Sequence, residues 1–71
     1  MNELFEALNS PHFHALRKYK TYWGIAHLSF DGVSIVEIYG NDLRKLLDQW
    51  IDINKALEIA AEDRQRLARN D

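Results

Sequence analysis

The sequence contains no cysteine, one proline and three glycines, and its apolar runs extend for only a few residues. Without cysteine, the chain can form neither disulfide bonds nor thiolate zinc sites. Three glycines are too few for a glycine-rich phosphate-binding loop. The apolar runs are far shorter than the roughly 20 residues that a membrane helix needs, and the acidic segment Met1-Asn2-Glu3-Leu4 lacks the apolar region of a signal peptide. We therefore expect a cytoplasmic protein with no membrane partner.

The chain is also short, and this limits the core that it can bury. Its 71 residues form one small domain, residues 1-71. A single core in a chain below roughly 70–80 residues seldom supplies more than ~3–5 kcal/mol of stability. Because disulfides are excluded, the chain needs either an unusually good small core or another chain. We expect another protein as its partner, and also a homo-oligomer, most simply a homodimer.

The composition is apolar and weakly acidic. Hydrophobic residues make up 46% of the chain, which excludes a disordered protein, and the net charge of −2 gives no global indication of nucleic acid. One segment, from Arg17 to Trp23, interleaves three cations with three aromatics, a pattern typical of grooves that bind single strands. Its ordinary interpretation is the C-terminus of a helix followed by a strand whose aromatics enter the core. We expect no nucleic-acid partner.

Helical periodicity predicts a kinked helix at the N-terminus. Residues 3–9 place Leu4, Phe5 and Leu8 on one face. Ser10-Pro11 interrupts this pattern, and these residue types suit the cap and first position of a new helix. A second helical piece is therefore expected from about residue 11 to 20. The pattern leaves open whether residues 3–20 form one kinked helix or two.

Two segments rich in β-branched and aromatic residues, 22–30 and 33–39, predict an antiparallel β-hairpin. Asp31-Gly32 between them indicates a type I′ turn. This turn sets Phe30 opposite Val33 and, further along, Ala26 opposite Glu37 and Ile25 opposite Ile38. Neither face alternates cleanly with polar residues, so we expect both faces to be largely covered. Glu37 is an exception on an apolar face, where it would lie at the sheet margin or pair with a Lys or Arg.

A long helix is expected to follow Gly40. Asn41 is a suitable N-cap, Asp42 favours the helix dipole, and no later Gly or Pro stops the helix before about Arg69. The inward positions repeat at spacings of three and four, which is a heptad pattern. Their members are Leu43, Leu46, Trp50, Ile53, Leu57, Ala60, Arg64 and Leu67.

This helix should be longer than the hairpin, because helical and extended residues rise about 1.5 Å and ~3.3 Å each. Residues from about Glu58 onward should therefore project past the sheet. Either the first helix or a second chain covers these residues, or they form a frayed, solvated tail. We expect the protein to self-associate through this helix, most strongly at Trp50, Ile53 and Leu57. An antiparallel pair would bring Arg64 towards acidic residues of the partner helix. The predicted architecture is α+β: a kinked N-terminal helix, a two-stranded antiparallel β-hairpin and a long C-terminal helix.

No arrangement of residues indicates catalysis or metal binding. His12 and His14 would point to different faces of a helix, so they cannot readily chelate one ion. His27 lies beside Ser29 and Ser34, but nothing marks a nucleophile, base and carboxylate held in catalytic geometry. We expect no enzyme activity, no cofactor and no metal site.

The Asp-Gly hairpin, the order of the elements and the run Asn41-Asp42-Leu43-Arg44-Lys45 resemble the small phage head–tail joining proteins. The resemblance covers about residues 24–50 and implies a structural subunit of a phage particle. The acidic composition and the longer last helix depart from that family, and no functional residue is carried over from it.

Taken together, these features predict a non-enzymatic protein-binding module that regulates or inhibits a larger protein or assembly. A head–tail joining subunit and a single-stranded nucleic-acid binder are the alternatives. The residues predicted to contact a partner are apolar or aromatic with one arginine, and they lie in the hairpin and the long helix: Tyr22, Trp23, Ile25, Trp50, Ile53, Leu57, Arg64 and Leu67.

Overall fold

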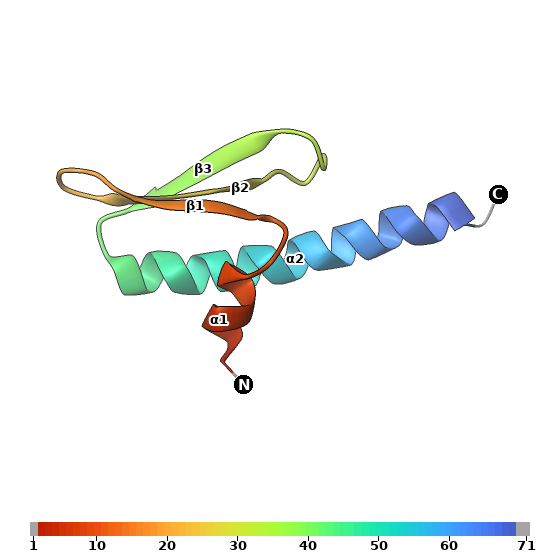
Figure 1. Ribbon diagram of the computed structural model, residues 1–71, viewed down its shortest axis with the longest axis horizontal. Helices are drawn as coiled ribbons and strands as arrows, with labels where there is room; N and C mark the ends of the chain where they lie inside the picture. The colour runs from red at the N-terminus through yellow and green to blue at the C-terminus, as the bar shows by residue number, and fades with distance from the viewer. Residues whose placement is uncertain (1, 70–71) are drawn as a thin grey trace.

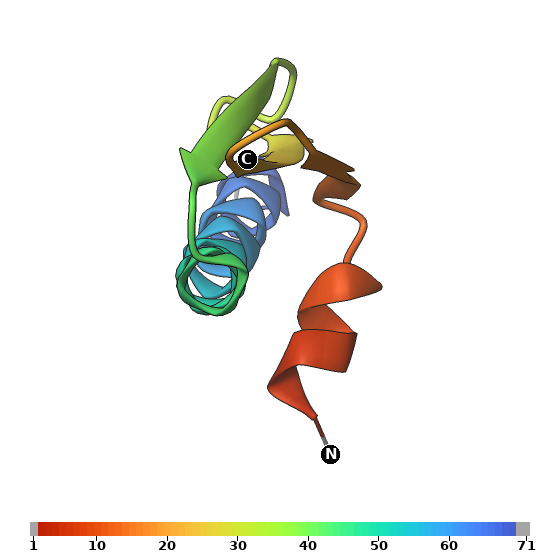
Figure 2. The same cartoon turned by 90° about the vertical axis from the view of Figure 1, so that its left-hand side faces the viewer.

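A computed structural model describes residues 2–69 as two layers, an antiparallel sheet and a long helix beneath it (Figure 1). The class is α+β, as predicted, but the sheet has three strands and not two, in the order β1-β2-β3. A short N-terminal helix lies beside the long one (Figure 2). The elements in chain order are α1 (Glu3–Leu8), β1 (Phe13–Lys18), β2 (Trp23–Leu28), β3 (Ile35–Gly40) and α2 (Leu43–Arg69).

The first helix is confirmed, but the second helical piece expected over residues 11–20 is wrong, because strand β1 occupies that segment. Ser10 does not cap a helix: its Oγ accepts the backbone N–H of His12 at 3.1 Å within a turn. A β-bulge between Phe13 and Ala15 shifts the register, so that Phe13 faces His27 while Leu16 faces Ile25. The bulge thus places Phe13 and Leu16 three residues apart on one face of a strand, which imitates helical spacing.

The predicted pairing of β2 with β3 is confirmed, with Ala26 opposite Glu37 and Ile25 opposite Ile38. The turn type is wrong. A type I′ turn needs positive φ at both central residues, whereas Gly32 (φ 77°) is the one described residue with positive φ. The ladder ends where the Ser29 N–H donates to the Ser34 carbonyl (2.7 Å), and Phe30 to Val33 form a loop.

The side chain of Asp31 explains this loop geometry. One of its oxygens accepts the backbone N–H groups of Val33 (2.8 Å) and Ser34 (2.9 Å), and the other accepts the Ser34 hydroxyl (2.8 Å). These bonds hold the pKa of Asp31 below its usual value. The carboxylate therefore stabilises the turn locally, without requiring a left-handed backbone at Asp31.

Helix α2 covers one face of the sheet, which corrects the expectation that both faces are covered. Ile25 and His27 of β2 point towards α2 and are buried. On the opposite, outer face, no helix among residues 2–69 lies over the strands (Figures 1 and 2). Ala26 nevertheless lies buried on that face, so side chains of the sheet itself must cover it.

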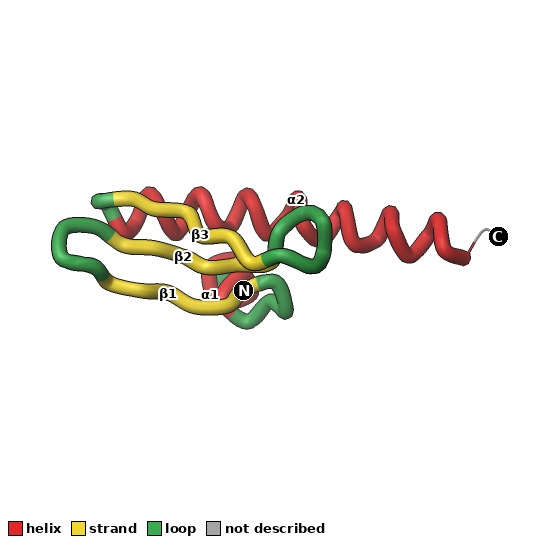
Figure 3. The backbone as a smooth tube through the Cα atoms, turned by 90° about the horizontal axis from the view of Figure 1, so that it is seen from above, coloured by secondary structure: helices red, strands yellow, loops and turns green. Residues whose placement is uncertain are grey.

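The predicted extent of the long helix is confirmed, with two refinements. Asp42 and not Asn41 caps it, since the Asp42 carboxylate accepts the Lys45 N–H at 3.2 Å. Beyond Glu58 the helix still contacts the β2–β3 loop, because Arg64 donates from Nη1 to the carbonyl of Phe30 at 2.9 Å. The C-terminal part of α2 projects past the sheet, as predicted and as Figure 3 shows from above.

The loop supports a first prediction. Gly32→Val should destabilise the protein by about 1 kcal/mol or more, because β-branched residues strongly disfavour positive φ. A side chain there would also approach Arg64, whose Nη2 lies 3.1 Å from the point that a Cβ would occupy. Thermal or urea unfolding measures the effect. Gly32→Asn is the control and should cost less, since Asn tolerates the left-handed region. Equal stability of the valine variant and the wild type would contradict this account of the loop.

Candidate interaction surfaces

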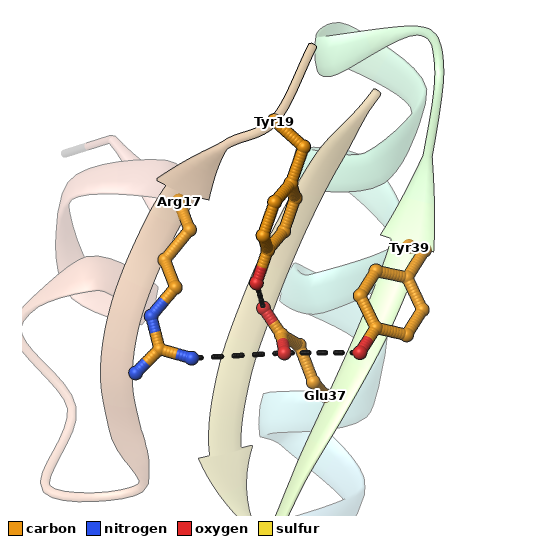
Figure 4. A network of polar contacts seen from close by, with 4 residues as sticks. All are labelled: Arg17, Tyr19, Glu37 and Tyr39. Carbon is orange, nitrogen blue, oxygen red and sulfur yellow. Dashed lines mark hydrogen bonds and ion pairs between the residues drawn. The ribbon is translucent and has the colours of Figure 1, made fainter. Parts of the chain in front are cut away.

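Four polar and aromatic side chains meet on the outer face of the sheet (Figure 4). The Glu37 carboxylate accepts the hydroxyl of Tyr19 at 2.8 Å and the hydroxyl of Tyr39 at 3.0 Å, one on each oxygen. The guanidinium of Arg17 lies 3.6 Å from the oxygen that Tyr39 reaches. Glu37 is thus held by partners from β1, from the turn after β1 and from its own strand.

Gly24 makes room for this network at the centre of the sheet. A Cβ at this position would lie 2.9 Å from the Tyr19 ring and would collide with the Glu37 carboxylate. Tyr22 extends the cluster, stacking on Tyr19 with ring centroids 4.7 Å apart and meeting Tyr39 edge-on at 5.6 Å. The outer face therefore carries three tyrosine rings in mutual contact, two of them fixed by Glu37.

The electrostatics of this network follow from the hydrogen bonds. Donation to the Glu37 carboxylate raises the pKa of Tyr19 and the pKa of Tyr39, since each bond exists only while the phenol is protonated. Arg17 opposes the rise at Tyr19. The sequence left two alternatives for Glu37, a place at the sheet margin or pairing with a Lys or Arg, and both describe it: β3 is an edge strand, and Arg17 is the paired cation. The contact with Tyr19 was not predicted, because residues 11–20 were expected to be helical.

A second exposed surface lies at the opposite end of the sheet, around the β2–β3 loop (Figure 3). Four large apolar side chains are exposed there: Phe30, Val33, Ile35 and Val36. We call these residues the hairpin tip. Beside them runs the free edge of β3, whose one charged residue, Glu37, is already engaged. By contrast, the other edge strand, β1, has a bulge and two exposed cations, Arg17 and Lys18, which are features that discourage edge pairing.

The residues predicted to contact a partner divide into three groups. Ile25, Trp50 and Leu57 are buried within the chain's own core. Trp23 and Ile53 are partly buried and pack against that core. Tyr22, Arg64 and Leu67 are exposed.

This division bears on the expected dimer. Trp50, Ile53 and Leu57 were expected to form its strongest contacts, but Trp50 and Leu57 are buried in the intramolecular core and Ile53 is partly buried against it. Arg64, which was expected to meet an acidic partner helix, instead bonds the Phe30 carbonyl of its own chain. Self-association remains a prediction. Among the residues of α2 that were predicted to contact a partner, Leu67 is the apolar residue that is exposed.

The three histidines do not converge. His12 lies with its Nδ1 3.1 Å from the Ser10 hydroxyl, and His14 occupies the bulge in β1. His27 is buried against Trp50, with ring centroids 5.0 Å apart, and its Nδ1 lies 2.8 Å from the Leu28 carbonyl. Within residues 2–69, no three His, Asp or Glu side chains are grouped so that they could hold a metal ion.

The chain matches no protein-family model, no curated protein and no solved structure. The resemblance to phage head–tail joining proteins gains no support from these comparisons. No helix in the described part of the chain is both long enough and apolar enough to cross a membrane.

The Glu37 network generates a second prediction. Tyr19 and Tyr39 should ionise above the ordinary tyrosine pKa, and Glu37→Gln should lower both values by removing the charged acceptor. The network should accordingly stabilise the fold below the ordinary tyrosine pKa, and this contribution should be lost as pH rises through the raised values.

Alkaline titration followed by tyrosinate absorbance measures the shift, with Tyr19→Phe and Tyr39→Phe assigning each transition. Glu62→Gln is the matched control, because Glu62 is exposed on α2 and its substitution should leave the titration unchanged. A Glu37→Gln curve that superimposes on the wild-type curve would refute the network.

Proposed function

We propose that the protein is a non-enzymatic protein-binding module, a small regulator or inhibitor that docks on a larger protein through the hairpin tip and the adjoining free edge of β3. The observation that supports this proposal is the exposure of large apolar side chains at one end of the sheet. Val33 is 82% exposed, and Phe30, Ile35 and Val36 are exposed beside it. Large apolar side chains that are exposed together at one end of a sheet are typical of interaction sites.

The tip is held in shape before any partner arrives. Asp31 bonds three groups of the loop, and Arg64 ties the Phe30 carbonyl to α2. A preorganised loop loses little conformational entropy on binding, so more of the burial energy appears as affinity. Fully burying one aliphatic side chain contributes roughly 1.5–3 kcal/mol.

The free edge of β3 adds a directional element. An edge strand offers unpaired backbone N–H and C=O groups, and an extended segment of another protein can pair with them. Ile35 and Val36 lie on opposite faces of this strand, so a docked strand would be flanked by apolar side chains on both sides. No observation on the described residues favours a phage joining subunit over this function.

The third prediction tests the tip. Tagged protein is used to capture partners from a cell extract, with mass spectrometry to identify them, and the affinity for a captured partner is then measured. Val33→Asp and Val36→Lys should each weaken that affinity at least about tenfold, because each puts a charge into an apolar contact. Both side chains are exposed, so thermal stability should change little.

Ile59→Lys is the matched control. Ile59 is an exposed aliphatic residue on α2, outside the hairpin tip, and its substitution should leave partner affinity unchanged. A partner that binds the two tip variants as tightly as the wild type would place the binding surface elsewhere and refute the proposal.

A further inference from the structure

The end of the sheet opposite the hairpin tip has a different chemistry, because charge is segregated along the chain. Between Glu6 and Asp31 the sequence contains no acidic residue, but it contains three cations, Arg17, Lys18 and Lys20. All three lie at the end of β1 or in the turn to β2, which the Tyr19 N–H closes by donating to the Tyr22 carbonyl (2.8 Å). Although the net charge of the chain is −2, this end of the sheet is therefore locally basic.

Exposed aromatic rings lie next to this basic end of the sheet. Tyr22 is 40% and Tyr39 57% exposed, and both rings lie on the uncovered outer face of the sheet. The side chain of Arg17 is 54% exposed on the same face. The Glu37 carboxylate on this face is mostly covered and is engaged by Arg17 and two phenols, so it fixes the rings more than it repels an approaching anion.

Lys18 and Trp23 are arranged differently. Trp23 points to the inner face, and the Nζ of Lys18 lies 5.5 Å from the centre of its ring. The sequence pattern from Arg17 to Trp23 therefore splits between the two faces of the sheet. Tyr39, which comes from β3 and lies outside that segment, supplies a ring on the outer face beside Tyr22.

We propose that this outer face binds single-stranded nucleic acid, with bases stacked on Tyr22 and Tyr39 and phosphates against Arg17 and Lys20. Stacking on aromatics beside a cationic track is the general chemistry of single-strand binding. An acidic protein segment would satisfy the cations but would leave the tyrosine rings without planar partners. A duplex keeps its bases stacked inside the helix and cannot offer them to the face. Local charge and the position of Tyr39 thus reverse the expectation drawn from the net charge.

The test measures the anisotropy of a labelled oligothymidylate titrated with the full chain at low and moderate salt. Binding should weaken with salt, as expected when phosphate contacts release counterions. Tyr39→Ala should weaken it about tenfold or more, whereas Tyr39→Phe keeps the ring and should retain binding. Lys20→Gln should reduce the slope of log affinity against log salt by about 0.7. Arg66→Gln, the same charge change near the far end of α2, should leave the slope nearly unaltered.

Three results would overturn the proposal: no binding at low salt, binding that Tyr39→Ala leaves unchanged, and a duplex of the same length that binds as tightly as the single strand. Polyglutamate of matched charge is used as the competitor, and competition equal to that of unlabelled oligothymidylate would identify an acidic protein segment as the occupant instead. Val33→Asp should bind the oligonucleotide normally, so failure of this proposal is distinguishable from failure of the hairpin tip as a protein-binding surface.

Discussion

The packing of Trp50 is the contact on which the rest of the structure depends. Its side chain is fully buried, and its indole Nε1 donates to the Ala7 carbonyl at 3.0 Å, which joins α2 to α1. Its ring also lies against Phe13 of β1 and His27 of β2, with centroids 5.9 and 5.0 Å away. One large side chain thus joins four of the five elements, which suits a domain too small to build a deep core.

Placing the core around Trp50 leaves the other face of the sheet without a second layer. A three-stranded sheet can tolerate one wet face if its side chains cover the backbone beneath them. The Glu37 network does this: the two phenols and Arg17 converge over Gly24, and the neighbouring Ala26 is buried. The side chains of this network shield the sheet from water, and their outer surfaces remain accessible to a ligand. One set of side chains therefore both covers the sheet and forms the proposed binding face.

Because the strands are antiparallel, their connecting loops lie at opposite ends of the sheet, and the two ends carry different kinds of side chains. The β1–β2 turn and the end of β3 bring cations and tyrosines to one end, while the β2–β3 loop carries apolar side chains to the other (Figure 3). Helix α2 runs beneath both ends, and its contact with the loop through Arg64 fixes the apolar end relative to the core. The two proposed surfaces can therefore be altered independently.

The sequence by itself determined the elements whose signals are local. Periodicity located α1 and α2, and two segments rich in β-branched and aromatic residues around Asp31-Gly32 set the correct register of β2 against β3. Other features were decided by the tertiary structure. The bulge that gives Phe13 and Leu16 helix-like spacing is stabilised by pairing with β2, which no local pattern reveals. Arg17 and Tyr19 reach Glu37 only because β1, once it is a strand, folds back beside β2. Likewise, the heptad positions of α2 are equally suited to a partner helix or to a sheet, and the burial of Trp50 and Leu57 against the chain's own strands decided between them. Hydrophobic periodicity shows which side of an element is apolar, but what covers that side depends on contacts between residues distant in the chain.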